Sequence, residues 1–348
     1  MAQDAAAVIS PADPVCSICI ANFNGESVIG PCLDSIRNQD CDLPLEIIVH
    51  DDASTDSSVE FIRTRYPDVT LIPSEGNVGY CVSNNRMVSR ARGRYILLLN
   101  NDAVLRRDAV RTLFLHAQQH PEPAILGLPQ YDIETGALID RGSLLDPFMN
   151  PVPNLDPGRV EVAMVMGACL WIPKLLWVEL GGFPEWFGSL AEDLYLCCLA
   201  RLRGFPVMVP HESGYDHWVG RSFRGGKVVR NTLQTSYQRR ALSERNKSYA
   251  FFICWPTALV YPFIALHLFL LTFEGLLLSA IKADGKMLES IYLPCVASVW
   301  KERHRLLQER ERVQRSARIG IFRFLRAFTP MPYKMKMLMR FGLPAIRS

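Results

Sequence analysis

The stretch 94–102, Arg-Tyr-Ile-Leu-Leu-Leu-Asn-Asn-Asp, changes abruptly from apolar to polar. Its apolar part, Tyr95 to Leu99, has the length of a strand and is typical of a strand buried on both faces of a sheet. Because open α/β sheets bind ligands at the carboxyl ends of their strands, the polar end is a candidate site for a metal and a phosphate. The alternative is a simple turn, since Asn and Asp favour turns.

Strand and helix patterns alternate on both sides of this stretch. Apolar runs predict strands at Val15–Ile20, Leu45–Val49, Val69–Ile72 and Val207–Val209. Helical spacing predicts helices from about Ser27, around Val59–Ile62, and over about Val82–Arg92, Asp108–His120 and Asp193–Arg203. Residues 121–160 are rich in Pro, Gly and Asp and indicate loops and short strands. Alternation through four strands predicts an α/β fold with a parallel sheet.

The charge of the chain is unevenly distributed. Its formal net charge is only +3, but residues 282–348 carry 15 Lys and Arg against 5 Asp and Glu. Such a basic tail suggests an anionic partner surface. The ten cysteines are scattered, and period two places Cys16 and Cys19 on opposite faces of a strand. We therefore expect reduced core thiols in a cytosolic environment, and no signal peptide at the acidic N-terminus.

Three of the predicted strands end in polar residues that could meet in one cleft. They are followed by Asn22 and Asn24, by Asp51 and Asp52, and by Asn101 and Asp102. A nucleotide needs an acceptor for a base N–H, groups for its ribose and a cation for its diphosphate. Either Asp51 or Asp52 could serve the base, and Asp102 could hold the cation, because a magnesium-type ion needs only one or two carboxylates beside phosphates.

A second carboxylate centre, Glu192-Asp193, follows the Gly-rich aromatic loop 181–189. The loop resembles the lining of an acceptor site, and a carboxylate that accepts a hydroxyl proton must lie within hydrogen-bond reach of it. The alternative is a helix start, where acidic residues are favoured electrostatically. His217 lies in the polar loop 216–222 and is a further candidate, although a lone histidine is more often structural. Walker, G-x-G-x-x-G, H-E-x-x-H and G-x-S-x-G motifs are missing from the sequence at the places that such enzymes need.

Several motifs in one order resemble family 2 glycosyltransferases with a GT-A fold. They are Val15–Gly25, His50–Ser57, Gly76–Asn85, Tyr95–Ala103, Gly167–Ile172, Gly181–Phe183, Glu192-Asp193 and His217–Ser222. The resemblance covers about residues 15–247 and looks closest to the rhamnosyltransferase-like branch that acts on bacterial surface polysaccharides. It implies a mixed, mainly parallel sheet flanked by helices, and an inverting, hexosyltransferase-type transfer from a nucleotide-sugar assisted by Mg²⁺ or Mn²⁺.

The resemblance also assigns roles to residues. Asp51 matches the aspartate that contacts the base, Asp102 stands at the metal aspartate of the D-x-D motif, and His217 matches a histidine that completes the metal site. Asp193, with Glu192 beside it, matches the catalytic base. Nucleotide-sugar contacts are expected from Asn22, Asn24, Asp51, Asp52, Asn77, Asn85, Asn101 and Arg245. Asn100 departs from the usual first Asp of D-x-D, and Met87 replaces a usual Gly.

The C-terminal part has a different character. Residues Ala250–Phe273 contain no formal charge, which meets the length criterion for a transmembrane segment. Pro256 and Pro262 interrupt this run, and basic residues flank it on both sides. An interfacial or re-entrant arrangement at the cytoplasmic face, or two short passes, is therefore favoured over a single span. A buried pair of soluble helices is the alternative.

These observations predict three segments: an extension at 1–13, a GT-A catalytic domain at 14–248, and a membrane-associated helical region at 249–348. The expected partners are a nucleotide-sugar donor, a glycan or lipid-linked acceptor and the cytoplasmic face of the inner membrane, without nucleic acid. Two alternatives remain open, a metal-dependent nucleotidyltransferase and a non-catalytic membrane-anchored sugar-binding protein.

Overall fold

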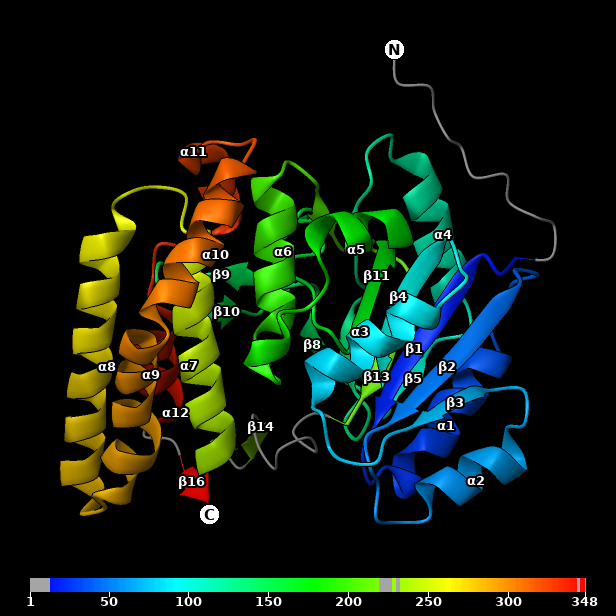
Figure 1. Ribbon diagram of the computed structural model, residues 1–348, viewed down its shortest axis with the longest axis horizontal. Helices are drawn as coiled ribbons and strands as arrows, with labels where there is room; N and C mark the ends of the chain where they lie inside the picture. Colours follow the sequence, from blue (N-terminus) through cyan, green and yellow to red (C-terminus); the bar gives the residue numbers. More distant parts are fainter. Residues whose placement is uncertain (1–12, 219–226, 230–231, 343–344, 348) are drawn as a thin grey trace.

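The computed structural model of the chain describes residues 13–218, 227–229, 232–342 and 345–347. Within these residues seven strands form the main sheet, and helices cover both of its faces (Figure 1). The order is β12 (Val207–Met208), β6 (Ile125–Leu126), β11 (Cys169–Pro173), β4 (Tyr95–Asn100), β1 (Cys16–Asn22), β2 (Leu45–Asp51) and β3 (Thr70–Pro73). Strands β1 to β4 are parallel, whereas β11 is antiparallel to β4 and β6. The predicted mixed, mainly parallel sheet is confirmed.

The stretch 94–102 lies near the middle of this sheet, where it forms β4. All five residues from Tyr95 to Leu99 are buried, and β4 ends at Asn100 as predicted. Residue Ala21 pairs with Asn100, and Asn22 pairs with Asp51, so the polar ends of β1, β2 and β4 lie at one edge. The register thus delivers the side chains of all three strand ends to the same place.

Helices on the two faces enclose separate cores. One core joins Cys19 and Leu98 to helices α3 (Tyr80–Arg90), α5 (Lys174–Leu180) and α6 (Glu192–Leu202). The other joins Cys16 and Leu97 to α1 (Glu26–Arg37), α2 (Ser58–Arg65) and α4 (Ala109–Gln119). Cys16 and Cys19 therefore lie on opposite faces, as period two predicts. All ten cysteines are among the described residues and are free thiols.

The loop-rich segment after α4 builds smaller sheets. Strands β5 (Ala103–Leu105), β13 (Tyr215–His217), β7 (Gln130–Asp132) and β8 (Leu138–Asp140) pair in that order. Short pairs join β9 (Leu144–Leu145) to β10 (Pro151–Val152), and β15 (Thr232–Ser236) to β14 (Lys227–Val229) and β16 (Ala345–Arg347). Pairing of β13 with β5 brings His217 opposite Ala103, next to the end of β4.

Helices of the C-terminal part stack beside α6 (Figure 1). They are α7 (Tyr237–Cys254), α8 (Val260–Lys282), a π-helix (Leu288–Tyr292), α9 (Leu293–Lys301), α10 (Arg303–Arg315), α11 (Ile321–Phe324) and α12 (Tyr333–Phe341). Single 3₁₀ turns occur at Glu185–Phe187 and Leu325–Ala327. The predicted domain boundary at residue 248 lies inside α7, which packs against both α6 and α10.

The uncharged run at 250–273 is divided between two environments. Residues Ala250–Cys254 complete α7 and are buried in the core shared with α6, so the expectation of membrane contact was wrong for this part. Helix α8 holds the remainder on the outer side of the molecule. Among the described residues it alone is long and apolar enough to cross a membrane, by length and composition. The break predicted at Pro256 is confirmed, because α7 ends at Cys254.

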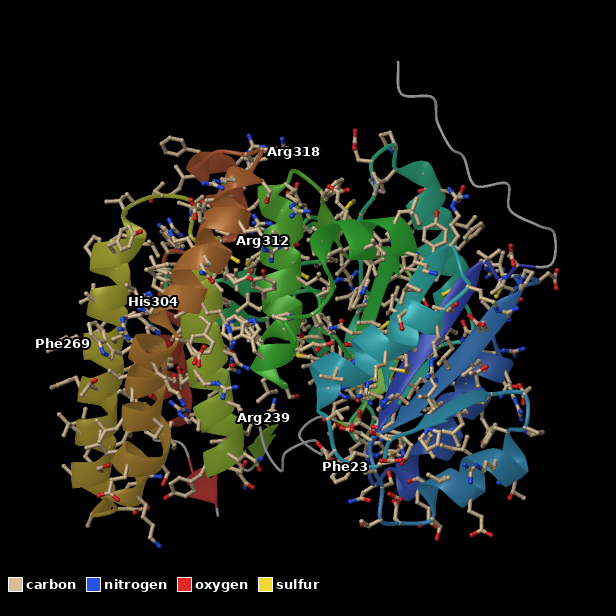
Figure 2. All side chains as sticks on the ribbon, viewed as in Figure 1. Phe23, Arg239, Phe269, His304, Arg312 and Arg318 are labelled. Carbon is tan, nitrogen blue, oxygen red and sulfur yellow. The ribbon has the colours of Figure 1, made fainter. Side chains whose placement is uncertain are left out.

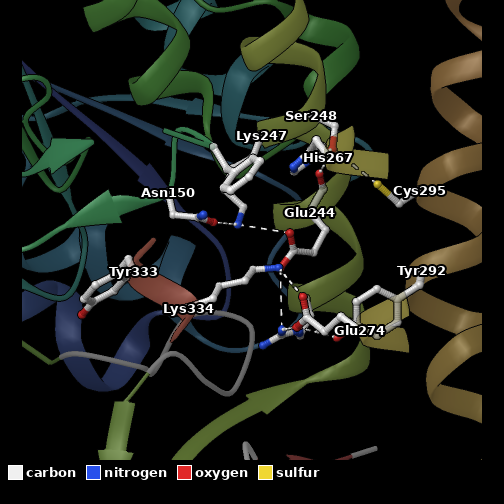
Figure 3. A network of polar contacts seen from close by, with 12 residues as sticks. Asn150, Glu244, Lys247, Ser248, His267, Glu274, Tyr292, Cys295, Tyr333 and Lys334 are labelled. Atoms are coloured by element: carbon white, nitrogen blue, oxygen red, sulfur yellow. Dashed lines mark hydrogen bonds and ion pairs between the residues drawn. The ribbon is translucent and has the colours of Figure 1, made fainter. Parts of the chain in front are cut away.

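Buried charges join this helical layer together (Figure 3). The Glu244 carboxylate lies 2.8 Å from the Lys334 ammonium, 3.2 Å from that of Lys247 and 3.8 Å from the Arg240 guanidinium. Glu274 of α8 binds Arg240 at 2.5 Å and Lys334 at 2.9 Å. The network therefore fixes α7, α8 and α12 to one another.

Candidate active site

The ends of β1, β2 and β4 form a hydrogen-bonded cluster. Asp51 is 1% exposed, and its carboxylate accepts hydrogen bonds from the Asn22 amide at 2.8 Å and from the Ser54 backbone N–H and hydroxyl at 2.9 and 2.7 Å. The Asn101 amide donates to the Asn22 side-chain oxygen at 2.8 Å. The structure thus brings together three residues predicted to bind a nucleotide, Asn22, Asp51 and Asn101.

Three other predicted nucleotide contacts, Asp52, Asn77 and Asn24, hold loops. The Asp52 carboxylate accepts from the backbone N–H groups of Val78 and Gly79 at 2.6 and 2.9 Å, and the Asn77 amide donates to the Asp52 carbonyl at 3.3 Å. Asn24 accepts from the Thr55 backbone N–H at 2.8 Å. These bonds position the loops that surround Asp51.

Asn85 lies elsewhere in the structure. Its amide donates to the Phe183 carbonyl at 2.9 Å and accepts from the Phe183 N–H at 3.0 Å. A further bond at 3.2 Å joins it to Glu185. Asn85 therefore fixes the Gly-rich loop, and its hydrogen bonds go to that loop rather than to the Asp51 cluster.

Asp102 and His217 meet at the end of β4. His217 Nε2 lies 3.0 Å from Asp102 Oδ1, and Asp102 is only 3% exposed. A carboxylate and an imidazole are suitable ligands for Mn²⁺ and, through the carboxylate, for Mg²⁺, which keeps several waters and substrate phosphates. Among the described residues no group of three or more His, Cys, Asp or Glu could hold a metal. Asp102 and His217 offer two ligands, a set that fits a cation whose remaining ligands are waters and substrate phosphates.

The second ring nitrogen of His217 is fixed by Gln130. Nδ1 lies 3.1 Å from the Gln130 amide nitrogen, and the Gln130 oxygen accepts from the Tyr215 hydroxyl at 3.0 Å. An amide can present either its N–H or its oxygen to the ring after a flip. As oriented here, the Gln130 amide N–H faces Nδ1 and fixes the ring; with the amide flipped, its oxygen would accept from Nδ1–H and leave Nε2 free to ligate a metal, in the way that outer partners orient metal-binding histidines. Residues 219–222 of the predicted loop lie outside the described residues.

Asp193 begins α6 at the same edge of the sheet. Its carboxylate accepts from the Gly167 N–H at 3.0 Å and from the Leu194 N–H at 2.7 Å. The Tyr80 hydroxyl donates to the Gly167 carbonyl at 3.0 Å and lies 3.2 Å from the Asn100 side-chain oxygen. Tyr80 and Gly167 thereby connect the end of β4 to Asp193, which places the two predicted carboxylate centres around one site.

Burial changes the acidity of both carboxyl groups of the Glu192-Asp193 pair. Loss of solvent, and then the charge of Asp193, raise the pKa of Glu192 from 4.5 to about 8. Loss of solvent also raises the pKa of Asp193, while the N–H groups of Gly167 and Leu194 oppose the shift. Glu192 Oε2 has no hydrogen-bond partner among the described residues. With a pKa of about 8, Glu192 holds its proton at neutral pH beside the Asp193 carboxyl group.

Arg239 is a site residue that the sequence analysis missed, because it was assigned to the basic flank of the apolar run. Figure 2 shows it beside the end of α6 that carries Glu192 and Asp193. Its positive charge opposes the rise in pKa of both carboxyl groups. A guanidinium here could also meet the diphosphate of a donor.

Arg245 and its neighbour Asn246 hold the loop before Glu192. Asn246 is fully buried, and its amide donates to the carbonyls of Phe187, Ser189 and Leu190 at 3.0, 2.8 and 2.8 Å. Arg245 donates to the Phe187 carbonyl at 2.9 Å. Both side chains therefore clamp the backbone that leads into Glu192-Asp193, and the sequence analysis missed Asn246 in this role.

Comparison with known proteins shows what this chain is similar to. Residues 17–164 match the family model of glycosyl transferase family 2. A mannosyltransferase from Pyrobaculum calidifontis, solved with GDP-Man and Mn²⁺, superposes with a TM-score of 0.51 and 17% identity over 87% of this chain and 88% of that chain. The architecture is therefore the GT-A fold of nucleotide-sugar transferases.

Curated relatives agree with this assignment over part of their length. A poly(ribitol-phosphate) β-glucosyltransferase of Bacillus spizizenii is 32% identical over 211 residues, which are 59% of this chain and 32% of that protein. An N-acetylglucosaminyl-diphospho-decaprenol L-rhamnosyltransferase of Mycobacterium tuberculosis is 25% identical over 44% of this chain and 60% of that protein. Residues 17–164 are thus similar to family 2 glycosyltransferases, and the matched regions span less than two thirds of the length of either relative.

Proposed function

We propose that this chain is an inverting glycosyltransferase that moves a sugar from a nucleotide-sugar to a hydroxyl of a glycan or lipid-linked acceptor. The observation that carries the proposal is the link from Asn100 through Tyr80 and Gly167 to Asp193. It sets a candidate base beside a candidate diphosphate site, as a single displacement at the anomeric carbon requires.

The donor would bind along the edge of the sheet. Asp51, supported by Asn22, offers an acceptor to the base, and Asp102 with His217 would hold Mg²⁺ or Mn²⁺. Such an ion stabilises the negative charge of the departing diphosphate. The P. calidifontis mannosyltransferase, which was solved with GDP-Man and Mn²⁺, supports this combination of ligands.

Asp193 would act as the general base. Its raised pKa increases its basicity, and the N–H groups of Gly167 and Leu194 hold the carboxylate in place. It removes the acceptor proton while the hydroxyl oxygen forms a bond to the anomeric carbon. The bond to the diphosphate oxygen breaks on the opposite face, and its electron pair leaves with the nucleoside diphosphate, so the configuration inverts.

Surface polysaccharide synthesis at the cytoplasmic face of the inner membrane is the setting that we propose. The M. tuberculosis relative is an N-acetylglucosaminyl-diphospho-decaprenol L-rhamnosyltransferase, which supports a lipid-linked acceptor and makes rhamnose the first donor sugar to test. The apolar helix α8 is consistent with such a location.

The proposal is tested by Asp193→Asn together with a screen of nucleotide-sugars. Donors are identified by thermal shift with Mn²⁺, since bound ligand stabilises the folded state. We expect the variant to bind the donor but to lose about 10²- to 10⁴-fold in transfer rate, because its amide cannot accept the proton. Chelation of the metal should abolish transfer by the native enzyme.

Asp156→Asn is the matched control, since Asp156 is an exposed carboxylate in a loop. It should retain native transfer. Native turnover in Asp193→Asn would exclude Asp193 as the base, and the absence of any stabilising nucleotide-sugar would contradict the transferase proposal itself.

A further inference from the structure

Helix α8 exposes apolar residues to solvent and turns its polar residues toward the protein. Every residue from Tyr261 to Ile281 that is exposed is apolar or aromatic. Phe269, Phe273 and Ile281 are 65%, 54% and 56% exposed, and Figure 2 shows Phe269 pointing away from the molecule at its outer edge. Only 28% of its most apolar window is buried. Contiguous exposed apolar surface of this kind marks an interaction site.

The polar residues of α8 are directed into the protein instead. His267 lies 2.8 Å from the Ser248 hydroxyl, and Glu274 binds Arg240 and Lys334 (Figure 3). Thr272 donates to the carbonyl of Leu268, and the Ser279 hydroxyl accepts from the Leu288 N–H. The side chains of His267, Thr272, Glu274 and Ser279 therefore all have partners within the protein.

Positive charge accompanies the apolar surface. Helix α12 is joined to α8 through Lys334 and Glu274, at 2.9 Å. Its exposed residues include Met335, Leu338 and Met339 together with Lys336 and Arg340. Apolar and basic side chains on one short helix favour the headgroup region of an anionic bilayer.

We propose that the exposed face of α8 is a docking surface for an anionic lipid bilayer, with the helix lying in the plane of the membrane. A helix of 23 residues is about 34 Å long and could span a bilayer by length alone. Spanning would carry Glu274, Arg240 and Lys334 into the hydrocarbon core, because ion pairs lock these residues together. Charged groups at that depth are costly. Docking by one face leaves the network intact.

This inference refines the membrane location in the proposed function and rests on it only for its biological setting. Binding to vesicles requires neither a donor nor transfer. Failure of vesicle binding with normal transfer to a soluble acceptor would therefore reject the docking surface alone, and the reverse result would reject the transferase proposal alone.

The full-length chain is tested by sedimentation with vesicles of phosphatidylethanolamine and phosphatidylglycerol, and with vesicles of phosphatidylcholine. We expect tighter binding to the anionic vesicles. The double variant Phe269→Glu with Phe273→Glu should bind at least about tenfold more weakly, since two apolar anchors are replaced by anions. Both side chains are exposed, so circular dichroism should remain native.

Helix α5 offers the matched control. Leu175 and Val178 are 84% and 65% exposed on the catalytic domain, and Leu175→Glu with Val178→Glu should leave vesicle binding unchanged. Equal losses in both double variants, or native binding by the α8 variant, would overturn the proposal. So would a chain that does not sediment with anionic vesicles but forms dimers that the α8 variant abolishes, because a second copy would then be the occupant.

Orientation is tested with a fluorescent label at Leu266→Cys, Phe273→Cys or Ala280→Cys, with Cys41→Ser to remove the half-buried native thiol. These three positions are seven residues apart and lie on one face, so an in-plane helix places all three labels at the same shallow depth. Lipid-attached quenchers report that depth. A deep label at residue 273 between two shallow ones would show a spanning helix and overturn the in-plane arrangement.

Discussion

The candidate active-site edge of the sheet and the C-terminal helices both bury carboxylates, but they bind them differently. Asp51 and Asp193 accept hydrogen bonds from neutral amides, hydroxyls and backbone N–H groups. Glu244 lies among three cations, Arg240, Lys247 and Lys334. Neutral donors fix a carboxylate while leaving its charge available to a ligand, whereas cations neutralise it. The comparison separates carboxylates that serve a site from carboxylates that hold helices together.

The two regions also place apolar residues differently. Tyr95 to Leu99 are buried between two layers of helices, as a central strand requires. In α8 the exposed residues, such as Phe269 and Phe273, are apolar, whereas polar residues such as His267 face inward. Composition alone predicts that both segments avoid water, but only the packing shows that one does so inside the protein and the other on its surface.

The largest effect on stability is expected from Glu244→Gln. Burial alone would raise the pKa of Glu244, but the charges of Lys247, Lys334 and Arg240 hold it well below its ordinary value. The variant leaves buried cations without their anion, and we expect a loss of about 3–5 kcal/mol in the free energy of unfolding. Denaturant titration at neutral pH measures it.

An exposed ion pair provides the contrast. Glu311 binds Arg315 at 2.5 Å, with both side chains more than half exposed, and Glu311→Gln should change stability by less than about 1 kcal/mol. Because the folded state lowers the pKa of Glu244, its contribution is present above the ordinary value of 4.5 and is lost as the pH falls below it. Equal losses of stability in Glu244→Gln and Glu311→Gln would show that the buried network stabilises the fold no more than an exposed ion pair does.

Much of the fold follows from local sequence. Tyr95 to Leu99 was predicted as a buried strand and is one, because a short apolar run has few other stable solutions. The small sheet that contains β13 was not predicted, since each of its strands has only three residues and β13 pairs with β5 and β7 over long sequence separations. Position in the chain placed Asp102 at a strand end, but only this sheet brings His217 to it.

Side-chain partners were the part of the site that sequence could not supply. Asn85 lies within a motif associated with nucleotide binding, yet its bonds go to Phe183 and Glu185, about a hundred residues away. Arg239 was assigned to a basic flank by its neighbours in sequence. Its effect on Glu192 and Asp193 arises from the packing of α7 against α6, which no local pattern encodes.

A moderate effect on catalysis is expected from Asn246→Ala. Three carbonyls of the loop before Glu192 lose their donor, so the carboxylates should be less well positioned. We expect kcat to fall about tenfold with little change in the KM of the donor, because misplacement affects the reacting geometry more than donor binding. Steady-state kinetics measure both constants.

Asn154→Ala is the matched control for this variant. Asn154 is 5% exposed; its amide donates to the Arg141 carbonyl, and its side-chain oxygen accepts from the Asp156 N–H. Its loss should lower stability without the selective fall in kcat. A similar kinetic change in both variants would mean that Asn246 acts only through stability and does not position Glu192 and Asp193.

The smallest expected effect concerns Glu192→Gln, which distinguishes the two members of the carboxylate pair. With a pKa of about 8, Glu192 is largely protonated at pH 7, and a neutral amide resembles it, so transfer at that pH should stay within about threefold of native.

Native Glu192 binds its proton more tightly when folded than when unfolded. Native stability therefore falls as the pH rises from about 5 to 8, while the variant lacks this loss and should be at least about 1 kcal/mol more stable at pH 8. Thermal unfolding across this range measures the difference, and Glu122→Gln, at an exposed residue, should show none. Loss of transfer at pH 7 comparable to that of Asp193→Asn would make Glu192 an equal partner in the chemistry, and Asp193 could no longer be assigned as the sole base.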